Sequence, residues 1–109
     1  MDAQTYKKYL EQQESFDEYA TQYKTLTNII HQYNFNYELI AVYNRDENDM
    51  SRSFRVKTGT STIFPSDINN LIDIFKPYNY SLSHIGYRGS IVLFFVDKTK
   101  IKATKHDTQ

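Results

Sequence analysis

The side chains that most often perform catalysis or bind metals are few in this sequence and fall into no familiar pattern. There is no cysteine among the 109 residues, which excludes a disulfide framework, a thiolate zinc site and a cysteine nucleophile. His31, His84 and His106 have no second histidine or carboxylate at the spacing typical of a zinc site. No G-x-S-x-G elbow is present to activate a serine. We therefore expect a non-enzyme with no metal and no cofactor, in which the histidines are structural or solvated.

Two loops are rich in oxygen-bearing side chains. Asp46, Glu47 and Asp49 crowd an acidic loop, but the glycine and the twelfth-position glutamate of an EF-hand are missing. Residues 58–62 (TGTST) could present hydroxyls and amides to a phosphate, but the lysine and glycine spacing of a P-loop is missing. Both loops are interpreted as ordinary solvated connections.

Charge is distributed unevenly along the chain, although its net charge is zero. Residues 1–50 hold four basic and nine acidic side chains, and residues 51–109 hold nine basic and four acidic ones. Such asymmetry can steer a charged partner, or it can reflect complementarity within one body. If the basic side chains share a face, they could follow a nucleic-acid backbone. The nucleic-acid-binding candidates are Arg52, Arg55, Lys57, Lys98, Lys100 and Lys102.

A tyrosine and an arginine between two glycines form another candidate binding site. Tyr87 and Arg88 stand between Gly86 and Gly89, which predicts a hairpin loop. A rigid aromatic ring beside a multidentate cation is typical of binding hot spots. We predict a partner-binding surface made of Tyr80, Tyr87 and Arg88, with an ordinary exposed turn as the alternative.

The elements that would position these residues begin with an amphipathic helix over residues 3–33. Neither Gly nor Pro interrupts this segment, and apolar residues recur every three or four positions. At about 1.5 Å per residue the helix would be on the order of 45 Å long, more than a small sheet can cover. We therefore predict a homodimer, with packing on the chain's own sheet as the alternative for part of the apolar stripe. The predicted dimer seam is Tyr9, Phe16, Tyr19, Tyr23, Leu26 and Ile30.

Four strands are predicted after this helix, over residues 37–43, 52–57, 78–85 and 90–97. In the second strand Phe54 and Val56 should face the core, and Arg55 and Lys57 should face outward. The fourth strand is apolar on both faces, which is typical of a central strand covered on both sides. A second helix should begin at Pro65-Ser66-Asp67, with Ser66 as its N-cap, and end at Pro77.

These elements predict an α+β protein in which a long N-terminal helix is followed by a ββαββ body. Its four-stranded antiparallel sheet should carry helices packed on one face. The length is that of one domain. We place the domain at residues 1–98, with the helix in 1–33 and the body in 36–97, followed by a basic tail over 99–109.

The function that these features favour is a non-catalytic interaction protein. The first fifteen residues lack an apolar signal-peptide core, and the longest apolar run, 91–96, is too short to cross a bilayer, so a cytoplasmic protein without membrane contact is expected. Tyr, Phe, Ile, Asn and Lys are frequent, as in A+T-rich coding sequences, which favours a phage or another mobile element. We expect an inhibitor or modulator of a host protein. The alternative is a nucleic-acid-binding or regulatory protein using the basic C-terminal half.

Overall fold

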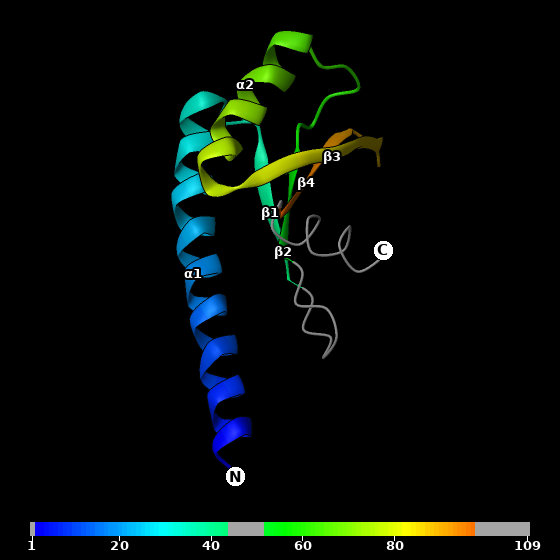
Figure 1. Ribbon diagram of the computed structural model, residues 1–109. Coiled ribbons are helices and arrows are strands. Elements are labelled where there is room, and N and C mark those ends of the chain that lie inside the picture. The colour runs from blue at the N-terminus through cyan, green and yellow to red at the C-terminus, as the bar shows by residue number, and fades with distance from the viewer. Residues whose placement is uncertain (1, 44–51, 98–109) are drawn as a thin grey trace.

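The chain folds into four antiparallel strands with helices packed against one side of the sheet (Figure 1), which confirms the predicted α+β class. The computed structural model describes residues 2–43 and 52–97, apart from the side chains of residues 8, 9, 12–16 and 43. The elements are α1 (Ala3–Tyr33), β1 (Glu38–Tyr43), β2 (Arg52–Lys57), α2 (Pro65–Phe75), a 3-10 helix η1 (Lys76–Tyr78), β3 (Tyr80–Tyr87) and β4 (Ile91–Asp97).

The order of strands across the sheet is β1-β2-β4-β3, and every neighbouring pair is antiparallel. It follows that β2 and β3 are parallel, joined through α2, with β4 inserted between them as in a split β-α-β unit. The prediction that β4 is a central strand is confirmed. The sequence also predicted that other elements cover both faces of β4. In the described part of the chain α1 and α2 both pack on the same face of the sheet.

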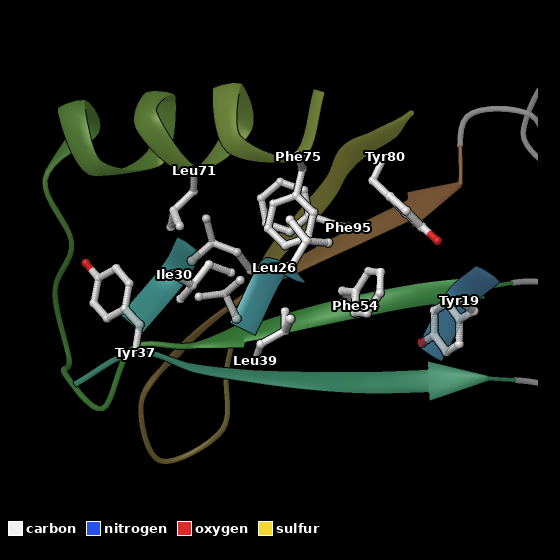
Figure 2. Close-up of a cluster of buried hydrophobic side chains, with 12 residues drawn as sticks. Tyr19, Leu26, Ile30, Tyr37, Leu39, Phe54, Leu71, Phe75, Tyr80 and Phe95 are labelled. Atoms are coloured by element: carbon white, nitrogen blue, oxygen red, sulfur yellow. The ribbon is translucent and has the colours of Figure 1, made fainter. Parts of the chain in front are cut away.

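We call the face of the sheet on which α1 and α2 pack the inner face. The hydrophobic core fills the layer between this face and the two helices (Figure 2). Phe54 of β2 lies at its centre, with ring centroids 4.8 Å from Tyr19, 5.0 Å from Tyr80 and 6.0 Å from Phe75. The Phe75 ring stacks on Phe95 at 3.9 Å. As predicted, Phe54 and Val56 are fully buried, whereas Lys57 is exposed and Arg55 is half-buried on the other face. Six aromatic residues are buried in the core: Tyr19, Tyr37, Phe54, Phe75, Tyr80 and Phe95.

Among the side chains of α1 that the structure describes, those that contribute to this core lie in its second half. Tyr19, Leu26 and Ile30 are buried against the sheet. The first turns of α1, blue in Figure 1, extend past the end of the sheet. There the side chains of Tyr6 and Leu10 are 54% and 42% exposed. The described apolar side chains of α1 are thus buried at Tyr19, Leu26 and Ile30 and exposed at Tyr6 and Leu10.

Two local predictions about α2 and β3 were wrong. The N-cap of α2 is Phe64 rather than Ser66, because Pro65 occupies the first helical position, which suits its fixed φ and missing N–H. Strand β3 begins at Tyr80 instead of residue 78, because η1 continues the helix and Asn79 ends it in the left-handed conformation (φ 65°). A third prediction, of Tyr87 in the hairpin loop, was also wrong, because β3 extends to Tyr87.

Candidate binding surface on the outer sheet face

We call the side of the sheet opposite α1 and α2 the outer sheet face. The pairing register aligns its side chains in rows that cross all four strands. The middle row runs Ile40, Arg55, Phe94 and His84, because Ile40 pairs with Arg55, Arg55 with Phe94, and Phe94 with His84. Arg55 and Phe94 are half-buried and His84 is exposed. Apolar and cationic side chains therefore meet on one accessible face.

Phe94 stands at the centre of this face and has planar or cationic neighbours. The imidazole of His84 stacks on the Phe94 ring, with centroids 4.1 Å apart and planes 11° from parallel. The guanidinium carbon Cζ of Arg55 lies 5.1 Å from the ring centroid, and that of Arg88 lies 6.0 Å from it. These distances are in the range of cation–π contacts. We call these four residues the Phe94 cluster.

Gly86 of β3 makes room for the Phe94 ring. A Cβ atom at this position would lie 3.1 Å from Cε2 of Phe94, closer than an ordinary van der Waals contact. A glycine in a strand often marks such a close approach. The missing side chain at Gly86 therefore allows the ring to lie across the neighbouring strand.

The neighbouring row extends the positive charge of the face. Lys57 is exposed and pairs with Val92 on one side and with Glu38 of the edge strand β1 on the other. Arg55, Lys57 and Arg88 thus bring three basic side chains to the surroundings of one aromatic ring. Glu38 is an exposed carboxylate of the same row, but Arg55, Lys57 and Arg88 outnumber it, so the face should attract anionic ligands.

The predicted nucleic-acid-binding residues are divided by the fold. Arg55 and Lys57 lie on the outer sheet face, but Arg52 belongs to the inner side. Its Nη2 lies 3.0 Å from Oδ2 of Asp97, and its Nη1 lies 3.5 Å from Oε2 of Glu18 on α1. Arg52 therefore joins α1 to the sheet. Lys98, Lys100 and Lys102 lie outside the described residues.

The predicted partner-binding trio does not form one surface. Tyr80 is only 2% exposed and its hydroxyl donates a hydrogen bond to Oε1 of Gln22 at 2.9 Å. Burial is the main cause that raises the pKa of this phenol. Tyr87 is 62% exposed, and strand alternation places it on the helix-bearing side. Arg88 alone reaches the outer sheet face.

The predicted dimer seam is used mainly within the chain. Tyr19, Leu26 and Ile30 are buried, and Tyr23 packs half-buried against the same core. The Tyr19 hydroxyl donates to the backbone oxygen of Ser53 at 2.6 Å, and burial raises the pKa of Tyr19 to about 12. The side chains of Tyr9 and Phe16 lie outside the described residues. Of the predicted seam, Tyr19, Tyr23, Leu26 and Ile30 are thus used in packing within the chain.

Two residues of the outer sheet face, Phe94 and His84, were missed as binding candidates. Phe94 lies in an apolar run that was interpreted as covered on both faces, and His84 was interpreted as a structural or solvated histidine. The signal that joins them is the strand register, which also aligns Arg55 with them. A period of two within each strand indicates the faces, but it does not indicate which residues are neighbours across strands.

Other kinds of site find no support in the described part of the chain. No three His, Cys, Asp or Glu side chains among residues 2–43 and 52–97 are grouped so that they could hold a metal ion. The hydroxyl of Thr58, in the loop over 58–62, donates to the backbone oxygen of Ile91 at 2.9 Å and thus anchors that loop to β4. The acidic loop over 46–49 lies outside the described residues. None of the helices described combines the length and apolarity needed to span a membrane.

No family model, curated protein or solved structure matches this chain. The class that its own geometry defines is a small α+β protein with a helix-covered inner face and a basic, aromatic outer sheet face.

Proposed function

We propose that this chain is a non-catalytic cytoplasmic interaction protein that binds an anionic macromolecule through its outer sheet face and thereby modulates it. The observation that supports this proposal is the Phe94 cluster, in which Arg55, Arg88 and His84 surround one accessible aromatic ring. Arginine and aromatic side chains supply much of the affinity in natural interfaces. Both helices lie on the opposite face, so a partner could approach without displacing them.

Charge reversal on the outer sheet face tests the proposal. We expect Arg55→Glu combined with Arg88→Glu to abolish the capture of partners from a host lysate, because a carboxylate would repel an anionic surface. The matched control is Lys24→Glu, since Lys24 is an exposed residue of α1 on the other side of the molecule. Equal capture by the double variant and by the wild type would refute the proposal, provided that both give the same circular dichroism spectrum.

We also propose that the protein self-associates through the first half of α1. This takes α1 as one continuous rod over residues 3–33, placed before a ββαββ body. The exposed side chains of Tyr6 and Leu10 support it, because they lie one turn apart on the part of α1 that extends past the sheet. A helix without tertiary contacts is marginally stable in water, and a second copy of the same helix would provide such contacts.

Light scattering over a range of protein concentrations tests self-association. We expect a dimer for the wild type and a monomer for Tyr6→Glu combined with Leu10→Glu, because both changes place charge in the helix–helix contact. Gln4→Glu is the control, since Gln4 is exposed and lies on the far side of the same helix. A wild-type monomer at tens of micromolar would exclude this dimer without affecting the proposal for the outer sheet face.

A further inference from the structure

We propose that the ligand of the outer sheet face is single-stranded nucleic acid, with bases stacking on the Phe94 cluster and phosphates contacting Arg55, Lys57 and Arg88. This inference rests on the proposed function, since it names the anionic partner of the same surface.

The stacking surface follows from the geometry of the middle row. His84 stacks on Phe94 with nearly parallel planes, and His84 itself is exposed. One side of the imidazole contacts Phe94, and its other side is available to a further planar group. Unpaired bases stack readily on aromatic and histidine rings, whatever their sequence. The Phe94 ring already contacts His84 from β3 and the Arg55 guanidinium from β2, so the flat surface that the stack offers to a base is the outer side of the imidazole.

The positions of the cations fit a backbone that passes beside stacked bases. Arg55 and His84 flank Phe94 on β2 and β3, Arg88 approaches it from the loop after β3, and Lys57 lies in the next row of β2. Arginine forms forked hydrogen bonds with phosphate, and lysine acts on it as a point charge. Three basic side chains therefore lie beside the Phe94 ring or in the next row of the same face.

The same charges argue against the chain's own C-terminal segment as the occupant of this face. Residues 98–109 contain four lysines, at positions 98, 100, 102 and 105. A segment of this charge is repelled by a face that presents Arg55, Lys57 and Arg88. The occupant that complements the face is an anion.

Among anionic macromolecules, the stack favours a nucleic acid with unpaired bases. An acidic protein segment would need the cations alone, and the parallel His84 and Phe94 rings would add little to its binding. In a duplex the flat surfaces of the bases are already stacked on one another, so they are not available to these rings. A single strand uses the cations and the rings together.

Fluorescence anisotropy with the full-length protein tests this inference. The probes are labelled oligothymidylate and oligouridylate of about 12 nucleotides, within the range of sites on comparable single-strand surfaces. A duplex and polyglutamate serve as competing anions. We expect both single strands to bind more tightly than the duplex or polyglutamate. With three phosphate contacts the logarithm of the affinity should fall against that of the salt concentration with a slope of about −2.

Three variants separate the roles of the residues. Phe94→Leu keeps an apolar side chain but removes the ring, and we expect it to weaken single-strand binding on the order of tenfold while leaving the salt slope unchanged. Arg55→Gln should reduce the magnitude of the slope by about 0.7. Lys24→Gln on α1 removes the same charge from the opposite side and should change neither. If Phe94→Leu fails to fold, His84→Ala replaces it, because His84 is exposed and tests the same stack.

Four outcomes would overturn the inference: no single-strand binding at low salt, equal affinity for polyglutamate, tighter binding of the duplex, or an unchanged affinity in both stacking variants. The proposed function fails separately. If Arg55→Glu with Arg88→Glu loses a lysate partner but no oligonucleotide binds, the face is an interaction surface for another anion. If neither experiment responds to these variants, the outer sheet face is not the binding surface.

Discussion

At the scale of single residues, Phe94 shows how the backbone register creates a site from ordinary side chains. None of the residues of the Phe94 cluster is unusual alone, and they come from β2, β3, β4 and the loop after β3. The pairing of Phe94 with Arg55 on one side and His84 on the other places them together. Gly86 then leaves the space in which the ring lies.

Substitution of Gly86 tests this arrangement. We expect Gly86→Ala to displace the Phe94 ring by a few tenths of an ångström, because the new Cβ would come 3.1 Å from Cε2. The change in the free energy of unfolding should be within about 1 kcal/mol, since the lower entropy of the unfolded alanine chain offsets part of the crowding.

The measurement for this prediction is the NMR chemical shift of the His84 ring protons, which lie in the ring current of Phe94. Ser81→Ala is the control, since Ser81 lies one row away on the same face, opposite Val96. Unchanged His84 shifts in Gly86→Ala would show that the glycine does not position the ring.

At the scale of elements, α1 contains two halves of one helix in different surroundings. Leu26 is fully buried between the sheet and α2, whereas Leu10 is 42% exposed on the part that extends past the sheet. Leu10 also lies about 160° around the helix axis from Leu26, so it points away from the side of α1 that packs on the sheet. Its exposure therefore reflects both its place along the helix and the face on which it lies.

The same substitution at these two positions gives a direct comparison. We expect Leu26→Ala to lower the free energy of unfolding by about 2–5 kcal/mol, because it leaves a cavity in the core. Leu10→Ala should lower it by no more than about 0.5 kcal/mol at low protein concentration, as for other surface positions. Urea denaturation measures both.

The same two variants can be compared by urea denaturation at several protein concentrations. If the first half of α1 contacts a second copy, the effect of Leu10→Ala should grow as the protein concentration increases, since dimerisation stabilises the folded state by mass action. The effect of Leu26→Ala should be the same at every concentration. Equal effects of the two substitutions would contradict the packing of α1 described above.

Strand positions were predictable where polar and apolar residues alternate, and less so elsewhere. The bounds of β2 and its inward-facing Phe54 and Val56 followed from alternation alone. Strand β3 was displaced by two residues, because η1 continues through Pro77 and the left-handed turn lies at Asn79 rather than at a glycine. The outward position of Phe94 was not predictable, because β4 is apolar on both faces and only its pairing with β2 and β3 distinguishes them.

At the scale of the whole molecule, polar contacts join α1 to the sheet around the buried core. The Tyr19 hydroxyl bonds to Ser53 of β2, the Tyr80 hydroxyl bonds to Gln22 of α1, and Arg52 connects Glu18 with Asp97. In the sequence, acidic side chains predominate in residues 1–50 and basic ones in residues 51–109. The ion pair of Arg52 with Glu18 joins these two parts of the chain. Packing, which composition does not reveal, decided that Tyr19 and Tyr80 are structural.

These contacts predict a loss of stability at high pH. The pKa of Tyr19 is raised from its ordinary value of 10.0 to about 12, and burial raises the pKa of Tyr80 as well. Because the folded state keeps these protons to higher pH than the unfolded chain, their contribution to stability is fully present below about pH 10 and is lost as the pH rises through the folded pKa. The free energy of unfolding should therefore fall between about pH 10 and 12.

Urea denaturation at a series of pH values measures this effect. The free energy of unfolding of Tyr19→Phe should fall less steeply with pH over that range than that of the wild type. Near neutral pH the variant should be less stable than the wild type by about 1 kcal/mol, because it lacks the hydrogen bond to Ser53. Tyr87→Phe, which changes an exposed tyrosine, should behave like the wild type. Parallel curves for all three proteins would contradict a role of the Tyr19 phenol in folding.

The strand order has a consequence for the synthesis of the chain. Strand β4, residues 91–97, is synthesised after every other described strand. It pairs with β2 on one side and with β3 on the other, so β3 is joined to the rest of the sheet through β4. While the ribosome is still adding residues before Ile91, the β1–β2 hairpin and β3 have no common hydrogen bonds, and the apolar side of α1 has only part of its cover. A nascent chain truncated before Ile91 should therefore bind chaperones. The full-length chain should complete its native sheet only after β4 has left the exit tunnel.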